Sequence, residues 1–262
     1  MSPFLAAALQ TNSTDVIDEN IAAIAAMAEE AAKKGARLIA LPENAFLMRR
    51  EGVAAPAHRM EHHPGVQWAR AFCEAHTLWM QIGSVRATVE GSDKPTNRSV
   101  LIDANGHIAA SYDKIHLFDV TLPDGTAYAE SSQVVAGTEP VVARTTLGVI
   151  GMSVCFDVRF PAHYQALVAQ GAEILTVPSA FTRPTGRAHW EPLLRARAIE
   201  SQAYVIAAAQ CGEHPGGRET YGHAMIIDPW GEVLAEAGTR PEIIYAEMDM
   251  ARVAEVRAAM PL

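Results

Sequence analysis

Short apolar runs alternate with helix-like segments along nearly the whole chain, and this alternation restricts the possible folds more than any other feature. Residues 4–10 form an apolar run, residues 16–34 have helical spacing after polar capping residues, and residues 36–43 form a second run. Further helix-like segments cover 64–76, 161–171 and 189–202, and further strand-like runs cover 78–85, 148–155, 172–180, 203–210, 221–228, 232–238 and 243–249. Asn105-Gly106 lies between two alternating runs and predicts a hairpin over 97–114. Helices mixed with hairpins favour a layered α/β fold over a purely parallel sheet.

The composition favours one domain and argues against several classes of partner. A length of 262 residues fits one large α/β domain, so we expect a single domain over residues 1–262. The formal net charge is -9 and lysine and arginine form no long run, which argues against nucleic acid or an anionic membrane as a partner. The chain has 3 cysteines, an odd number, which argues against a disulfide framework and favours a reducing compartment. No segment has the ~20 apolar residues that a membrane span needs. Because the first residues also lack the basic segment of a signal peptide, we expect a cytoplasmic protein.

Three polar residues stand at the ends of strand-like runs, next to turn residues. Glu43 lies in LPEN, Lys114 ends the hairpin in SYDK, and Cys155 ends the run before FDVRFP. Each alone has an ordinary structural explanation, namely a capping carboxylate, an exposed lysine and a buried thiol. Ligands of open α/β sheets bind at the carboxyl ends of strands. Together, the three side chains predict a site with a base, a cation and a nucleophile.

Acyl transfer to a thiol requires these three kinds of group. A free thiol has a pKa of about 8.5, so we expect the charge of Lys114 to activate Cys155 and Glu43 to accept the thiol proton. Attack on an amide carbon places negative charge on the carbonyl oxygen, and Lys114 and the backbone N–H of Phe156 can donate to that oxygen. Glu43 can then protonate the departing ammonia and later help water to cleave the thioester.

With LPEN around Glu43, YDKIHLFDV around Lys114 and CFDVRFP around Cys155, the chain resembles the nitrilase (carbon–nitrogen hydrolase) superfamily. The resemblance implies a Glu–Lys–Cys triad at these positions and a four-layer α-β-β-α sandwich. It also implies that Glu130, in TAYAESSQ, positions Lys114 and the substrate. Members of this superfamily commonly pair through the second layer of helices, so the resemblance implies a homodimer or a higher homo-oligomer.

Within the superfamily, PSAFT, TGRAHWE and YGHAMIIDPWG resemble the branch of deaminated glutathione amidases, with the ω-amidases next. This implies hydrolysis of the terminal amide of a small anionic 2-oxo acid such as deaminated glutathione. A 2-oxoglutaramate-type monoamide, a nitrile and an N-carbamoyl compound stay open as substrates. Phe156 and Ala162 depart from the family pattern, which often has tyrosine and glutamate there. We expect Arg183, in FTRPTGRAHW, to bind the substrate carboxylate, with Arg159 and Arg187 as neighbouring candidates.

Other clusters carry weaker predictions. His58, His62 and His63 are close in sequence, but nearby prolines and the absence of an H-E-x-x-H pattern favour an exposed loop over a metal site. A Cys155–His116 pair would suggest a papain-like protease, although the usual context of that cysteine is missing. No glycine-rich nucleotide-binding motif is present, so we expect neither a cofactor nor a metal. A non-catalytic scaffold on the same fold also stays open, and measuring ammonia release from small ω-amides would decide.

Overall fold

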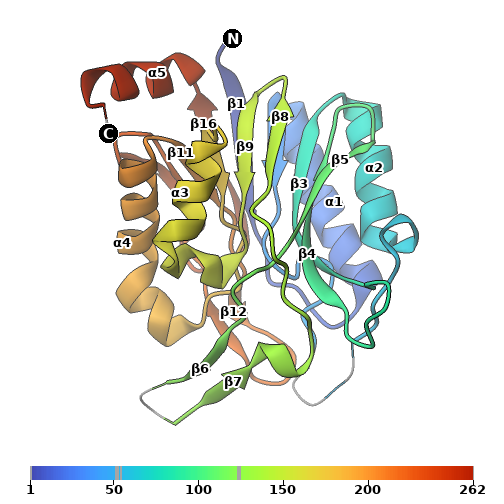
Figure 1. The fold of residues 1–262 in the computed structure, drawn as a ribbon. Coiled ribbons are helices and arrows are strands. Elements are labelled where there is room, and N and C mark those ends of the chain that lie inside the picture. The colour runs from blue at the N-terminus through green and yellow to red at the C-terminus, as the bar shows by residue number, and fades with distance from the viewer. Residues whose placement is uncertain (1, 51–52, 54, 123–124, 262) are drawn as a thin grey trace.

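The computed structural model describes residues 2–50, 53, 55–122 and 125–261, and two six-stranded sheets lie at its centre (Figure 1). The first sheet has the order β16-β1-β2-β3-β4-β5. Its strands are β1 (Phe4–Gln10), β2 (Ala36–Ala40), β3 (Trp79–Ala87), β4 (Thr96–Ile102), β5 (Ile108–Asp113) and β16 (Glu242–Met248). The second sheet has the order β15-β14-β11-β10-β9-β8. Its strands are β8 (Val142–Thr145), β9 (Gly148–Met152), β10 (Ile174–Thr176), β11 (Tyr204–Ala207), β14 (Met225–Ile227) and β15 (Val233–Glu236).

Both sheets follow the same pairing pattern. Strands β1, β2 and β3 run parallel in the first sheet, and β9, β10 and β11 run parallel in the second. In each sheet, the remaining strands pair antiparallel with their neighbours. Strands β4 and β5 form the hairpin that Asn105-Gly106 predicts. Since parallel strands end at the same edge, each sheet presents one edge where the loops after its parallel strands gather.

Helices cover the outer face of each sheet. Helices α1 (Ile17–Lys33) and α2 (Pro64–His76) pack on the first sheet, and α3 (Pro161–Ala169) and α4 (Arg183–Ser201) pack on the second (Figure 1). Helix α5 (Met250–Ala259) follows β16. The layers are therefore helix, sheet, sheet and helix, and the predicted α-β-β-α sandwich is confirmed.

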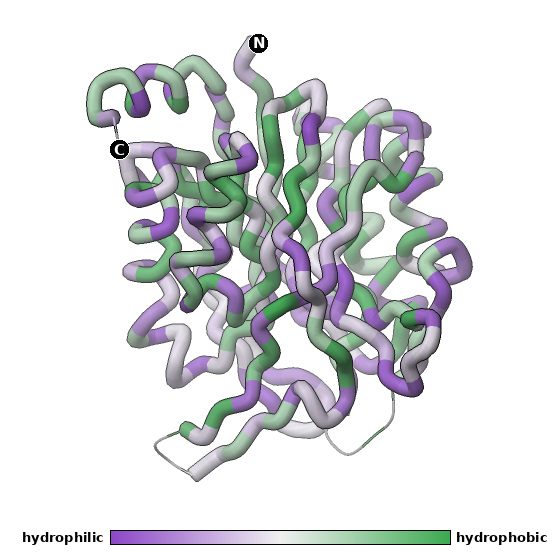
Figure 2. The backbone as a smooth tube through the Cα atoms, viewed as in Figure 1, coloured by the Kyte–Doolittle hydropathy of each residue, from purple (hydrophilic) through white to green (hydrophobic). Residues whose placement is uncertain are grey.

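The alternation of side chains along the strands explains why the runs are apolar throughout. In β1, Phe4, Ala6 and Ala8 belong to the core between the sheets, whereas Ala7 and Leu9 belong to the core beneath α1 and α2. A strand buried on both faces needs apolar residues at every position. Figure 2 shows these hydrophobic segments along the central strands.

Several elements differ from the sequence prediction, which included neither β8 nor α5. Helix α4 begins at Arg183, where the sequence predicts a loop up to residue 188, and β10 covers only Ile174–Thr176 of the predicted 172–180. Gly186 favours a loop in the sequence, but a Cβ at this position would lie 2.3 Å from the ring and Cβ of Tyr221. The glycine therefore serves close packing of the helix rather than a turn.

Smaller elements complete the fold at the end where the parallel strands finish. They are the hairpins β6 (Asp119–Thr121)–β7 (Ala127–Ala129) and β12 (Cys211–Glu213)–β13 (Glu219–Tyr221), and the 3-10 turns η1 (Met60–His62), η2 (Glu130–Ser132) and η3 (Cys155–Arg159). Among the described residues, no helix has the length and hydropathy required to cross a membrane.

Candidate active site

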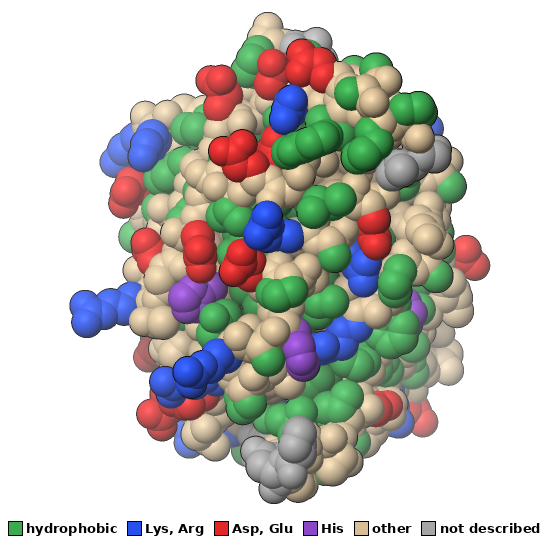
Figure 3. Space-filling view, turned by 90° about the vertical axis from the view of Figure 1, so that its left-hand side faces the viewer, with side chains coloured by type: hydrophobic (Ala, Val, Ile, Leu, Met, Phe, Trp, Pro, Cys, Tyr) green, Lys and Arg blue, Asp and Glu red, His purple; other side chains and the backbone are tan. Residues whose placement is uncertain are grey.

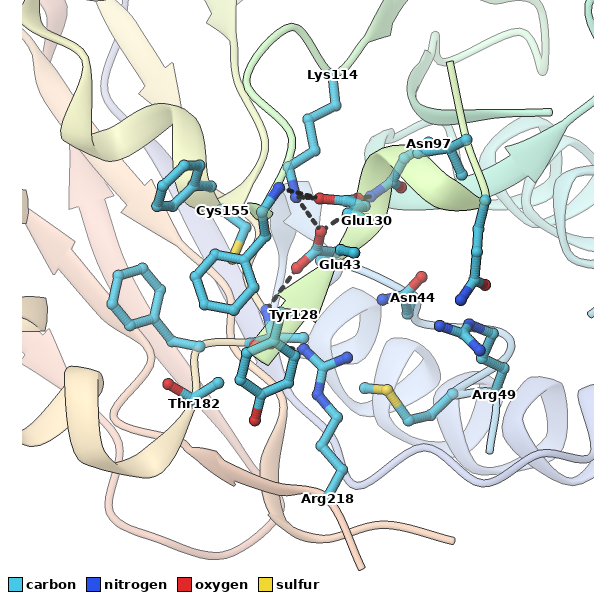
Figure 4. A pocket seen from close by; sticks show the side chains of 18 of the residues that line it. Glu43, Asn44, Arg49, Asn97, Lys114, Tyr128, Glu130, Cys155, Thr182 and Arg218 are labelled. Atoms are coloured by element: carbon cyan, nitrogen blue, oxygen red, sulfur yellow. Dashed lines mark hydrogen bonds and ion pairs between the residues drawn. The ribbon is translucent and has the colours of Figure 1, made fainter. Parts of the chain in front are cut away.

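The three residues at the predicted strand ends line one pocket between the two sheets. Glu43 follows β2, Lys114 follows β5, and Cys155 follows β9, so the first sheet supplies the two charged groups and the second supplies the thiol. The pocket has a volume of about 320 Å³, within the range of cavities that enclose small-molecule ligands. The Lys114 ammonium, the Glu43 carboxylate and the Cys155 sulfur converge at its inner end (Figure 4).

Cys155 lies in a turn that holds the thiol toward this pocket. Its φ is 50°, a left-handed value that is unfavourable for a residue with a side chain. The turn is fixed by the Cys155 N–H, which donates to Pro178 O at 2.9 Å, and by buried Asp157. The Asp157 carboxylate accepts hydrogen bonds from Val154 N at 2.8 Å, Tyr112 Oη at 2.7 Å and His116 N at 3.1 Å.

Lys114 forms ion pairs with two glutamates. Its Nζ lies 3.0 Å from Glu43 Oε1 and 2.8 Å from Glu130 Oε2, and the lysine is only 1% exposed. Glu130 comes from η2, after the β6–β7 hairpin, and its Oε2 also accepts a hydrogen bond from Phe118 N at 2.7 Å. The geometry brings Glu130 to Lys114, as the family resemblance implies.

Asn97 connects the two glutamates, and sequence reasoning missed this residue. Its Nδ2 donates to Glu43 Oε1 and to Glu130 Oε1, both at 3.0 Å. Its backbone carbonyl accepts from Lys114 N at 3.0 Å, since β4 and β5 pair beside the site. On the other side, Ala180 N donates to Glu43 Oε2 at 2.9 Å. A signal for Asn97 was present, because it begins the predicted hairpin that Lys114 ends.

Burial and charge set the protonation states of the triad. Burial alone would raise the pKa of Glu43, but the charge and hydrogen bond of Lys114 outweigh it and hold that pKa below its usual value. Burial alone would lower the pKa of Lys114, but Glu130 and Glu43 raise it, so the ammonium persists. The pKa of the Cys155 thiol is raised, first by burial and then by the negative charge of Glu43.

The sequence predicts that the charge of Lys114 activates the thiol, but burial and Glu43 raise the thiol pKa by more than Lys114 lowers it. The charge of Lys114 does favour the thiolate, but two carboxylates already neutralise the ammonium. The resting site therefore holds a neutral thiol beside an ionised Glu43, to which the thiol is hydrogen-bonded. This arrangement can transfer the proton from sulfur to carboxylate as the sulfur attacks an electrophile.

Phe156 lies on the pocket wall next to the thiol. Its backbone N–H donates to no backbone carbonyl of the described residues, so this donor is available to a ligand oxygen. Its ring packs against Phe118 with centroids 5.1 Å apart. Tyr128 and Phe181 also line the pocket, which gives it an aromatic side near Cys155.

Arg183, the predicted carboxylate contact, does not reach the pocket. It is the first residue of α4, and its Nη1 forms an ion pair with Glu219 Oε1 at 3.0 Å, with the arginine side chain 66% exposed. The prediction assumed a loop, whereas the helix directs this side chain to the surface pair. Three other arginines line the pocket in the described part of the chain, namely Arg49, Arg86 and Arg218.

Arg218 lies beside the carboxylate of Glu43. Its Nη2 donates to Ala180 O at 3.0 Å. Burial raises the pKa of Glu43, and the charge of Arg218 lowers it, though by less than the charge of Lys114 does. The Nε of Arg218 is buried and has no hydrogen-bond partner in the described structure. Figure 4 shows the guanidinium directed toward Glu43. The arginine follows a Gly-Gly turn, and nothing near it in the sequence distinguishes it from a surface residue.

His116, His58 and His63 contact other side chains of the protein. His116 Nδ1 lies 2.7 Å from Asp157 Oδ1, its ring stacks on Phe160 at 3.6 Å, and it is not among the described residues that line the pocket. The Cys155–His116 alternative therefore has no support in the geometry. His58 and His63 pack edge to face at 5.1 Å. The described residues contain no group of three or more His, Cys, Asp or Glu side chains that could hold a metal ion.

Comparison with known proteins identifies the family and the fold of this chain. Residues 5–258 match the profile of the family described as carbon-nitrogen hydrolase. The chain is 42% identical over 269 residues to a deaminated glutathione amidase of Synechocystis sp., which covers 100% of this chain and 97% of the relative. It is 40% identical over 266 residues to the deaminated glutathione amidase of Homo sapiens, which covers 98% of this chain and 80% of the relative.

Solved structures give the same result. The NitFhit protein of C. elegans matches with a TM-score of 0.90 and 35% identity over 100% of this chain, which spans 64% of that longer protein. Nit3 of Saccharomyces cerevisiae, a member of branch 10 of the nitrilase superfamily, matches with a TM-score of 0.85 and 28% identity, over 99% of this chain and 95% of Nit3. With the family profile covering almost the whole chain and the fold shared along its full length, this protein belongs to the carbon–nitrogen hydrolases of the nitrilase superfamily.

Proposed function

We propose that this protein is an amidase that hydrolyses deaminated glutathione through a thioester on Cys155. The observation that carries the proposal is the buried Lys114, paired with Glu43 and Glu130 beside the thiol, in a pocket that also contains arginines. The names of the relatives support the substrate, because several of them, at 36–42% identity, are deaminated glutathione amidases.

The first half of the reaction forms the thioester. Glu43 accepts the thiol proton while Cys155 Sγ attacks the amide carbon. The carbonyl oxygen becomes negative, and Lys114 Nζ and the Phe156 N–H donate to it. Protonated Glu43 then gives its proton to the leaving amine as the carbon–nitrogen bond breaks.

The second half releases the acid. Water loses a proton to Glu43 and attacks the thioester carbon, and the same donors stabilise the oxyanion. The carbon–sulfur bond then breaks, Glu43 returns its proton to the departing thiolate, and the acid product loses its own proton to solvent and leaves as a carboxylate. Glu130 does not exchange protons in this scheme, and its role is to position Lys114 through the 2.8 Å ion pair.

The substrate carries negative charge, which the pocket must neutralise. In deaminated glutathione an oxo group replaces the α-amino group of the glutamyl unit, so the acyl part is a 2-oxo acid with a free carboxylate and the leaving amine belongs to cysteinylglycine. The whole protein has a formal net charge of -9 and repels such a molecule, so local cations are required. We assign the acyl-side carboxylate to Arg218, which replaces Arg183 because of its place beside Glu43.

A substrate panel tests this function. The panel contains deaminated glutathione, 2-oxoglutaramate, a neutral aliphatic amide of similar length, a nitrile and an N-carbamoyl compound, with kcat/KM measured for each. We expect the two anionic amides to be the best substrates. A charged hydrogen bond contributes roughly 1.5–3 kcal/mol, so Arg218→Gln should raise KM for both by about tenfold or more, with a smaller change in kcat. Arg183→Gln is the matched control and should leave KM unchanged.

Faster turnover of the neutral amide or of the nitrile would reject the proposed substrate class while leaving the thiol mechanism in place. Equal effects of Arg218→Gln and Arg183→Gln on KM would reject the assignment of the carboxylate contact.

We further propose a cytoplasmic homodimer or higher homo-oligomer in which residues 1–262 act as one carbon–nitrogen hydrolase domain. The three cysteines are free and buried, as in a reducing compartment. Around the end of α4, Ile199, Trp230 and Met260 are exposed, at 42%, 55% and 39%. Figure 3 shows hydrophobic side chains in several groups between charged ones on the face of α3 and α4. Such a face fits association with a second copy.

A further inference from the structure

The pocket contains a second cationic position, separate from Arg218. Arg86 comes from the end of β3 in the first sheet, and Arg49 comes from the loop after β2. Arg218 lies between β12 and β13, and Figure 4 shows it at a separate place from Arg49. A ligand with one carboxylate needs only one of these positions.

Sheet register places Arg86 close to the catalytic carboxylates. Arg86 is the cross-strand partner of Asn97, whose side chain bonds Glu43 and Glu130 at 3.0 Å. Directly opposed residues of an antiparallel pair have Cβ atoms about 4.5–5.5 Å apart on the same face. Arg86 therefore lies next to the amide that holds Glu43, on the face of the sheet that forms the pocket wall.

The guanidinium of Arg86 is poorly compensated. Nη2 donates to Gln133 O at 3.1 Å, and Nε is buried without a hydrogen-bond partner in the described structure. No carboxylate of the described residues forms an ion pair with it. Burial and the charge of Arg49 lower the pKa of Arg86 by more than the charge of Glu130 raises it. A half-buried cation beside a like charge is unfavourable unless a ligand supplies the missing anion.

We propose that Arg86 binds the carboxylate of the leaving group, so that the enzyme recognises both ends of its substrate. This inference rests on the proposed function. Glu43 protonates the leaving amine, so that amine must lie against Glu43. Asn97 contacts Glu43 and Arg86 lies opposite Asn97, on the same wall of the pocket. Cysteinylglycine has two residues and spans at most about 7 Å, a length suited to reach from Glu43 to a guanidinium rooted beside Asn97.

The first test compares two substrates that share the acyl group. Deaminated glutathione releases a dipeptide with a carboxylate, and 2-oxoglutaramate releases ammonia. We expect Arg86→Gln to raise the ratio of the two KM values, deaminated glutathione over 2-oxoglutaramate, by about tenfold. Arg183→Gln, which removes a surface guanidinium, should leave the ratio at the wild-type value, and Arg86→Lys should restore part of it.

The second test changes the ligand and is made on the wild-type enzyme and on Arg86→Gln. The analogue of deaminated glutathione with a carboxamide at the glycine end should have a KM about tenfold higher for the wild-type enzyme. In Arg86→Gln, the acid and the carboxamide should have nearly equal KM values, because the group that distinguishes them is gone.

Three outcomes would overturn the subsite. An unchanged KM ratio in Arg86→Gln would do so, and so would equal wild-type KM values for acid and carboxamide, in each case with turnover of deaminated glutathione intact. A wild-type enzyme without turnover of deaminated glutathione would overturn the proposed function and this subsite together.

Discussion

At the scale of single residues, the thiol of Cys155 is the group that the sequence describes least well. Its type and its place after a strand predict a nucleophile, which the charge of Lys114 is expected to activate. The structure gives a raised pKa, because the thiol is buried and faces Glu43, and because Lys114 is neutralised by two carboxylates. Burial and the second carboxylate arise from the tertiary fold, which a residue pattern does not contain.

This protonation state predicts the pH dependence of the reaction. The pKa of Glu43 is held below its usual value and that of the Cys155 thiol is raised above its usual value, so one protonation state, thiol with carboxylate, dominates around neutral pH. We expect kcat/KM to be nearly flat between about pH 6 and pH 8.5 and to fall at acid pH as Glu43 becomes protonated. The measurement uses S-methylated deaminated glutathione, so that the substrate has no thiol to titrate.

A rate that rises with a midpoint near pH 8.5, the ordinary value for a free thiol, would contradict this account. It would show that the reactive species is a solvent-exposed thiolate and that Glu43 does not act as the base.

At the scale of elements, the short turn after β9 determines where the thiol points. Asp157 accepts bonds from Val154 N, His116 N and Tyr112 Oη, and so joins the turn to the segment after β5 that carries Lys114. Burial alone would raise the pKa of Asp157, but the hydrogen bond from His116 and the other donors lower it, so the carboxylate is ionised. One buried carboxylate thus couples the turn that carries Cys155 to the segment that carries Lys114.

Asp157→Asn should disturb both stability and catalysis. The NH2 group of the asparagine would face hydrogen-bond donors, where the carboxylate of Asp157 accepts from them. A buried polar group without a partner lowers the free energy of unfolding by about 1–3 kcal/mol. Displacement of the turn should lower kcat by about 10- to 100-fold. Urea unfolding and kcat of the folded enzyme measure the two effects.

Asp103→Asn is the matched control, since Asp103 accepts from Asn105 N and His107 N in an exposed turn away from the site. It should leave kcat unchanged. If Asp157→Asn loses stability and keeps full kcat, the turn does not depend on this carboxylate for its catalytic geometry.

The elements themselves were largely predictable. Strand β1 and helix α2 have the predicted bounds, because an apolar run and a helical period with proline at the first turn are local signals. The start of α4 was missed, since Pro184 and Gly186 are typical of loops and only the packing of Gly186 on Tyr221 explains the glycine. Local patterns identify elements well, and contacts between elements decide their ends.

At the scale of the whole molecule, two sheets with the same pairing pattern bring distant parts of the chain together. Glu43 and Lys114 come from one sheet and Cys155 from the other, and the family motifs were sufficient to select them. The arginines were not predictable in this way. Arg183 is near the site in sequence but pairs with Glu219 at the surface, whereas Arg86 and Arg218 reach the pocket through sheet register and a distant hairpin.

The proposed oligomer is testable through the end of α4. Ile199 lies against Gly231, next to Trp230, and Gln202 Nε2 donates to Met260 O, so the three exposed apolar residues surround one helix end. Light scattering should give a wild-type mass of at least two chains of 28.2 kDa. Ile199→Arg should shift it toward one chain, whereas Val16→Arg, at an exposed position on the opposite layer, should not. A monomeric wild-type protein, or the same mass in both variants, would contradict the proposal.

The central claim is that amide hydrolysis passes through a thioester on Cys155, and rapid quenching followed by mass spectrometry tests it most directly. The wild-type enzyme is mixed with deaminated glutathione, quenched in acid and digested, and the peptide that contains Cys155 is weighed. We predict a 2-oxoglutaryl adduct on that peptide during turnover, its loss when substrate is exhausted, and no release of cysteinylglycine by Cys155→Ala. Release of cysteinylglycine by Cys155→Ala at the wild-type rate, or wild-type turnover with the adduct on another residue, would contradict the account.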